Sequence, residues 1–222
     1  GLGDVYKRQV GNTSVLVRYM PVVKEKWYFA VSAETPSDQL GVDGVNTQKV
    51  TNWMPDWAAF VQYEWAKGQH VRLSGVLRTL SYRNLLAEQN HNVMGWGAML
   101  SSVAHPHPRI TTYASATIGR GFEGTGGDLQ VGNYDLIANP DAPGRMYAPE
   151  AFGWNIGVQY NFRPNLFASV QMSQMRLLPS ETISPAEYKY GLYWTANLFW
   201  NLTPRIQAVS YTHLRAHETS LH

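Results

Sequence analysis

The chain has 222 residues, with 18 Lys and Arg against 16 Asp and Glu, a formal net charge of +2 at pH 7, and no cysteine. The small net charge, without a clustered stripe of Lys or Arg, argues against a nucleic-acid partner, and the lack of cysteine excludes disulfides and thiol nucleophiles. No run of about 18 apolar residues is present, so no membrane-spanning helix is predicted. Charged residues make up 15% of the chain and aromatic residues 13%, a composition that favours a membrane β-barrel.

The two ends of the chain are predicted not to be protein sequence. Residues 4–9, DVYKRQ, can be encoded by DNA whose reverse complement, in a shifted frame, encodes VSYTH, the sequence of residues 209–213. The ends therefore look like inverted copies of one short element, as a sequencing adapter produces, and we treat residues 1–9 and 209–222 as adapter-derived. The alternative is two unrelated termini that back-translate in this way. Residues 10–208 are then expected to be an internal fragment of a longer gene.

Apolar and polar residues alternate with a period of two through residues 10–208, as is typical of β-strands. Every second residue from Phe152 to Phe162 is apolar, and only Gly, Asn and Gln lie between them. In chain order, strands are predicted near residues 12–20, 27–34, 57–65, 70–79, 94–104, 109–119, 152–162, 165–177 and 188–200, with a tenth beginning at 205. Most have about 9–11 residues, the length at which a tilted strand crosses a bilayer.

Short and long connections alternate between these strands. Short turns are expected at residues 21–26, 66–69, 105–108, 163–164 and 201–204, and long loops at 35–56, 80–93, 120–151 and 178–187. Outer-membrane barrels show this alternation, with tight periplasmic turns and long extracellular loops. Open sheet edges cannot be satisfied in lipid, so the prediction is all-β: part of an antiparallel up-and-down transmembrane β-barrel, about ten strands of a larger barrel. The alternative, a soluble β-sandwich that binds carbohydrate through Trp residues, leaves the alternation unexplained.

Aromatic residues are concentrated near the ends of the predicted strands. Such residues form the two interfacial girdles of a membrane barrel, where their rings lie at headgroup depth. One girdle is expected to contain Trp27, Trp65, Phe162 and Trp200, and the other Trp57, Trp96, Trp154 and Tyr190. The lipid bilayer of a bacterial outer membrane is therefore the expected surrounding of this chain.

Four segments carry a pattern known from one protein family. A strand through Trp27 ends in the sequence Ala-Glu-Thr-Pro-Ser at residues 33–37, and it is followed later by VRLSGVLR at 71–78, GWG at 95–97 and GRG at 119–121. Together these segments, which span most of residues 12–200, resemble the DcaP-like outer-membrane porins. The resemblance implies a homotrimer of closed barrels, a cleaved signal peptide, and passive uptake of small anionic hydrophilic solutes such as dicarboxylates.

Polar positions of the predicted strands are expected to face a water-filled lumen. The pore-lining candidates are Arg18, Glu34, Gln62, Glu64, Arg72 and Arg78. A cationic wall beside an acidic one makes a transverse field that favours anions. Arg72 and Arg78 lie on one face of a strand, about 20 Å apart, and are interpreted as a selectivity ladder. The alternative is that they are water-facing or rim residues without a special role.

The longest connection, residues 120–151, is rich in Gly, Asp and Pro. A loop of this length is usually functional, and in a pore it either folds inward as a constriction or remains outside as an exposed flap. The constriction candidates are Arg120, Glu123, Asp128, Asp135, Asp141 and Arg145. Both alternatives are left open by the sequence.

No catalytic, metal or cofactor site is predicted. His105 and His107 resemble a metal-binding pair, but they lie in a short turn with no third ligand nearby in the sequence, so a plain turn is expected. The prediction is therefore a diffusion channel rather than an enzyme. The alternative is an outer-membrane barrel enzyme or adhesin that works through its long extracellular loops.

Overall fold

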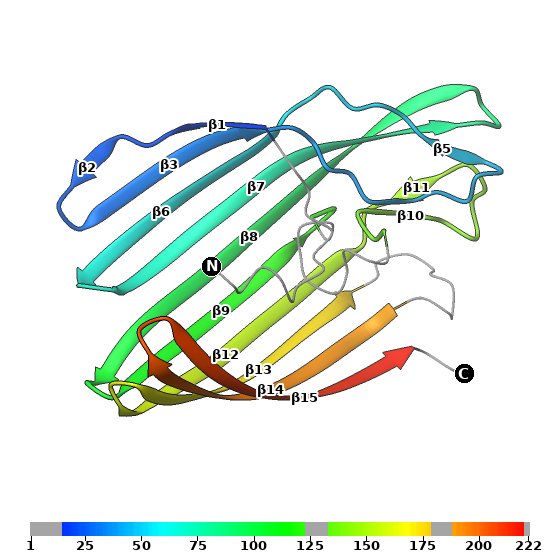
Figure 1. Cartoon of the computed structure of the whole chain (residues 1–222). Coiled ribbons are helices and arrows are strands. Elements are labelled where there is room, and N and C mark those ends of the chain that lie inside the picture. The colour runs from blue at the N-terminus through cyan, green and yellow to red at the C-terminus, as the bar shows by residue number, and fades with distance from the viewer. Residues whose placement is uncertain (1–14, 123–132, 179–187, 220–222) are drawn as a thin grey trace.

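The regular structure of the chain is β-strand throughout the residues that the computed structural model describes, which are 15–122, 133–178 and 188–219 (Figure 1). The described residues contain no helical segment with the length and hydrophobicity of a transmembrane helix. The predicted residues 1–9, Glu123 and Asp128 lie outside the described part of the chain.

One 12-stranded sheet dominates the fold. Its path follows β1 (Leu16–Tyr19), β3 (Trp27–Glu34), β6 (Asp56–Ala66), β7 (Gln69–Asn84), β8 (Gln89–His107), β9 (Ile110–Arg120), β12 (Glu150–Arg163), β13 (Leu166–Leu178), β14 (Tyr188–Thr203) and β15 (Ile206–Thr219). Two short strands, β2 (Val22–Lys24) and β5 (Thr47–Lys49), pair with β3 and β7. Strands along the path pair antiparallel and in chain order, and no pairing among the described residues closes the sheet. The predicted all-β, antiparallel up-and-down arrangement is confirmed.

The prediction of a long loop at residues 80–93 is wrong. β7 and β8 continue as a hairpin through this region, with Leu80 opposite Val93 and Asn84 opposite Gln89. The hairpin extends because the inward side chains of Leu80 and Tyr82 become buried, at 0% and 4% exposure. Their burial stabilises strand structure where the polarity pattern alone suggested a loop.

The two faces of the sheet differ in chemistry. One face, called the outer face here, presents apolar side chains to the exterior, including Leu77 at 56% exposure and Ile156 at 57%. The opposite, inner face carries the polar side chains that alternate with them, such as Arg72 and Asn155. Exposed apolar surface over this many strands is expected where lipid rather than water covers the sheet.

The hydrophobic core lies between the inner face and two long connections. A second, three-stranded sheet joins these connections: β4 (Leu40–Gly41), β10 (Leu136–Ala138) and β11 (Met146–Tyr147). Its residues pack on inward side chains of the large sheet in two clusters, Leu40, Leu80, Tyr82, Leu136, Met146 and Ala148, and Phe122, Tyr134, Ile137, Tyr147, Ala151 and Leu177. Figure 1 shows β5, β10 and β11 together at the end of the sheet away from the short turns. The described part of connection 120–151 therefore packs on the inner face, and that the connection constricts a channel remains a prediction.

The last strand differs in pattern from those before it. β15 pairs with β14 along its length, but the outward residues Ser210 and Thr212 of β15 lie opposite Leu198 and Ala196. The apolar alternation of the outer face is thus interrupted at residues 210 and 212. That residues 209–222 are adapter-derived remains a prediction.

Candidate functional site on the inner wall

A row of polar side chains crosses the inner face, from near the short turns on β3 and β7 to the middle of β9, β12 and β13. The cross-strand register places the following residues opposite one another in succession: Tyr28, Gln62, Arg72, Ser101, Ser115, Asn155 and Ser173. Since directly opposed residues share one face of a sheet, this row forms a continuous hydrophilic band across seven strands. Arg72 is the cation of this band.

The guanidinium of Arg72 is oriented by its neighbours on the wall. Its Nε and Nη2 donate hydrogen bonds to Gln62 Oε1 at 2.8 and 2.5 Å, and its Cζ lies 4.6 Å from the ring centroid of Phe60. Among the described residues no carboxylate lies within ion-pair distance of Arg72. The amide and the ring hold the side chain in place without neutralising its charge, so Arg72 presents a positive charge to the inner face.

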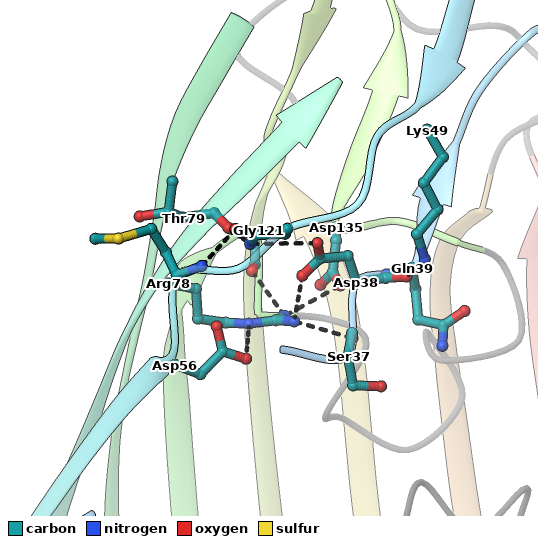
Figure 2. Close-up of polar contacts among 11 residues, drawn as sticks. Ser37, Asp38, Gln39, Lys49, Asp56, Arg78, Thr79, Gly121 and Asp135 are labelled. Carbon is teal, nitrogen blue, oxygen red and sulfur yellow. Dashed lines mark hydrogen bonds and ion pairs between the residues drawn. The ribbon is translucent and has the colours of Figure 1, made fainter. Parts of the chain in front are cut away.

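Arg78, six residues further along β7, has entirely different surroundings (Figure 2). It is 2% exposed, and every nitrogen of its guanidinium has a partner. The contacts are Nε to Asp56 Oδ2 at 2.9 Å, Nη1 to Asp135 Oδ2 at 3.0 Å and to the Gly121 carbonyl at 3.1 Å, and Nη2 to the Ser37 carbonyl at 2.9 Å and to Asp38 Oδ1 at 3.4 Å. We call Arg78, Asp38, Asp56 and Asp135 the Arg78 cluster.

Two glycines make room for this cluster. Gly95 lies opposite Arg78 on β8, and a Cβ at this position would lie 2.7 Å from the Gly121 carbonyl oxygen. Gly121 has a φ of +64°, and a Cβ there would lie 2.7 Å from Leu80 Cδ1. The close approach of the Gly121 carbonyl to Arg78 therefore depends on glycine at both positions.

The expectation that Arg78 faces water on a selectivity ladder is wrong. Arg72 and Arg78 share a face of β7 as predicted, but the connections 35–55 and 133–149 cover the end of the strand that carries Arg78. Asp135, a predicted constriction residue, is fully buried against Arg78. Sequence reasoning missed Asp38 and Asp56 as partners of Arg78, because the alternation of apolar and polar residues within a strand does not reveal contacts between distant segments.

Acidic groups in connection 35–55 have shifted pKa values for identifiable reasons. Burial raises the pKa of Asp38, against the opposing effects of Arg78 and Lys49. Lys49 donates from Nζ to the Asp38 carbonyl at 2.5 Å. Burial alone would raise the pKa of Asp43 as well, but hydrogen bonds from Asn46 and Thr47 outweigh it and lower the value to about 2. Asp43 thus anchors the turn that leads into β5.

The remaining lumen candidates lie on the inner face, on strands β1, β3 and β6. Arg18 is opposite Ser32, whose Oγ donates to Glu34 Oε1 at 2.9 Å. Glu64 Oε1 accepts from the Gly68 amide at 3.1 Å, in the short turn between β6 and β7. In the described part of the chain, Arg18, Glu34 and Glu64 make no side-chain hydrogen bond or ion pair with Arg72, so Arg72 and its Gln62 partner form the polar centre of the wall.

The constriction candidates separate into different groups. Arg120 lies opposite Trp96 and Glu150 on the outer face. The prediction that Arg120 belongs to an inward constriction is therefore wrong. Strand β9 extends to Arg120, and the two-residue period puts this side chain on the same face as Ile118. Asp141 and Arg145 are exposed in the connection between β10 and β11.

The predicted girdle residues lie on the outer face. Trp27, Trp65, Phe162 and Trp200 lie beside short turns, and their exposed fractions are 43%, 37%, 48% and 51%. Trp57 and Trp96 both flank Leu77 at the same level of the sheet. Trp154 lies opposite Ala116 and Gln174, further from the strand end, and Tyr190 lies opposite Arg176. Contact of these rings with lipid headgroups remains a prediction.

Comparison with known proteins gives one informative similarity. No model of a known protein family matches the sequence, and no curated protein sequence matches it. The structure is similar to the crystal structure of the outer membrane channel DcaP of Acinetobacter baumannii, with a TM-score of 0.74, 15% sequence identity, and coverage of 92% of this chain and 56% of that chain. Similarity to the NanC porin covers 91% of this chain and 79% of that chain at 11% identity, and its TM-score of 0.43 is too low to carry an argument. The chain thus spans just over half the length of the DcaP structure and shares the fold of the part that it matches.

Proposed function

We propose that this chain is part of a bacterial outer-membrane channel through which small anionic hydrophilic solutes diffuse. The observation that carries the proposal is the contrast between the faces of one sheet: an apolar outer face, and an inner polar band centred on Arg72, whose charge is neutralised by no carboxylate of the described segments. The fold shared with the DcaP channel supports this reading. By this proposal the protein works in the outer membrane, as a homotrimer, without catalysis or a cofactor.

Anion preference in this channel arises from a fixed charge beside water. Arg72 attracts a carboxylate, and its remaining N–H groups can donate to it, while the serine and asparagine side chains of the band replace part of the solute's hydration. Arg78 adds little to this field, since three aspartates surround its charge. A solute therefore passes by diffusion, and the wall biases the sign of its charge.

The proposal is tested by recording single channels of the protein that carries this chain in a planar bilayer under a salt gradient. The expected result is an open channel whose reversal potential has the sign of anion preference, with a preference that weakens as salt screens the wall. A cation-selective channel would contradict the assigned role of Arg72. A protein that inserts but never conducts would instead favour a barrel enzyme or adhesin with a filled lumen.

A further inference from the structure

We propose that Arg78 is a positioning residue that latches the connections 35–55 and 133–149 onto the inner wall, and so sets how far they project into the lumen. The attachment itself is independent of the proposed function, and only its effect on conductance rests on that function. Arg78 belongs to β7 in the wall, Asp38 and Asp135 belong to the two connections, and Asp56 begins β6. One side chain therefore joins the wall to both connections (Figure 2).

The two connections are also tied to each other. Asp135 Oδ2, which accepts from Arg78, accepts a second hydrogen bond from the Gln39 amide at 2.8 Å. Leu136 and Leu40 are partners in the parallel pairing of β10 with β4. The two connections thus behave as one unit, and we expect a change at Arg78 to affect both.

The charges around Arg78 make the latch sensitive to loss of this residue. The charged groups that face the cluster are Asp38, Asp56 and Asp135, with Arg78 and Lys49 as the cations, so the acids exceed the bases by one. Asp56 Oδ1 is buried with no hydrogen-bond partner among the described residues. Without Arg78, three largely buried carboxylates would face one lysine. Removal of one partner from a buried ion pair leaves uncompensated charge, which strongly disfavours the arrangement in which the two connections lie against the wall.

Neutralising one carboxylate has the opposite consequence. Asp38 makes the longest of the three ion pairs, at 3.4 Å, and its backbone carbonyl rather than its carboxylate holds Lys49. Asp38→Asn balances the charges and retains an oxygen that can accept from Arg78. The latch should therefore survive Asp38→Asn and fail in Arg78→Gln, although both changes remove one charge from the same cluster.

The test uses a cysteine reporter beneath the connections. The chain has no cysteine, so Ala148→Cys introduces a single thiol at a position that is 8% exposed and packs with Leu80 and Tyr82. The rate of labelling by a water-soluble maleimide is measured in the folded protein that carries this chain. With Arg78→Gln we expect labelling at least about tenfold faster, because the connections open locally while the barrel remains folded. Asp38→Asn should leave the rate within about twofold of the parent.

Arg72→Gln is the matched control. It removes an arginine from the same face of the same strand without touching the connections, so the labelling rate should not change. Unchanged labelling in folded Arg78→Gln would show that the apolar clusters alone hold the connections, and this result would overturn the latch. Accelerated labelling in Arg72→Gln as well would also overturn it, since the effect would then be general loosening.

A second variant covers the case in which Arg78→Gln does not fold. In the triple variant Arg78→Gln, Asp56→Asn, Asp135→Asn, one acid and Lys49 remain, so no excess charge opposes folding, yet the wall has lost its attachment. Fast labelling of Ala148→Cys in this background supports the latch, and slow labelling contradicts it.

In channel recordings Arg78→Gln should change conductance or gating noise, whereas Arg72→Gln should change the reversal potential. A protein that never conducts would count against the proposed function, while the labelling result would still decide the latch.

Discussion

Replacement of Ile156 by Arg is expected to lower the free energy of unfolding in a bilayer by about 2–4 kcal/mol, the cost of an arginine on the lipid face near the midplane. Ile156 lies in the middle of β12 (Glu150–Arg163) and is 57% exposed on the outer face. In water an exposed isoleucine can be replaced at little cost, so a large penalty arises only if lipid covers this face.

The neighbouring residue supplies the control for this prediction. Asn155 lies on the inner face, opposite Ser115 and Ser173, and Asn155→Arg should change stability by no more than about 1 kcal/mol because water can solvate the new charge. Urea unfolding of both variants in liposomes compares them directly. Equal and small effects at the two positions would mean that both faces meet water.

Replacement of Arg72 by Glu is expected to reverse or abolish the anion preference that we propose for the channel. Two unit charges 4 Å apart interact with about 1 kcal/mol even in bulk water, which corresponds to a change of roughly fivefold in relative permeability. Replacing a positive charge by a negative one doubles this change in interaction energy. Because no carboxylate pairs with Arg72 among the described residues, the wall has no nearby charge to compensate. The reversal potential at low salt measures this effect.

Arg72→Lys separates charge from geometry at this position. Lysine keeps the positive charge but loses the planar fork that binds Gln62 and lies over Phe60. The sign of selectivity should persist in this variant, while the affinity for a carboxylate solute should fall. If Arg72→Glu retained full anion preference, the selectivity would have to reside elsewhere along the channel.

The sequence pattern revealed the strands well because their alternation has a direct physical cause. A strand between lipid and water must alternate, as residues 152–162 do, and β12 and β13 lie where this pattern predicts them. The pattern misled at residues 80–93, where the connections cover the inner face. There Leu80 and Tyr82 point inward to a hydrophobic cluster, while Ser81 and Arg83 point outward, so the polarity of the alternation is inverted.

The site was predictable only to the level of the face on which a residue lies. The alternation placed Arg72 and Arg78 on one face of β7, as observed. It did not show that Arg78 would be buried, since its partners Asp38 and Asp135 are 40 and 57 positions away in the chain. Which loop covers which end of a strand depends on tertiary packing, and no local pattern records it.

We expect one face of this sheet to meet lipid and the other a water-filled lumen, and an accessibility scan along β12 distinguishes the two faces. Single cysteines are placed at the inner residues Asn155, Gln159 and Asn161 and at the outer residues Ile156, Val158 and Tyr160. With the protein inserted in a membrane, a water-soluble thiol reagent should label the inner set and leave the outer set unlabelled. Labelling of both sets would show that the outer face is exposed to water and is not covered by lipid.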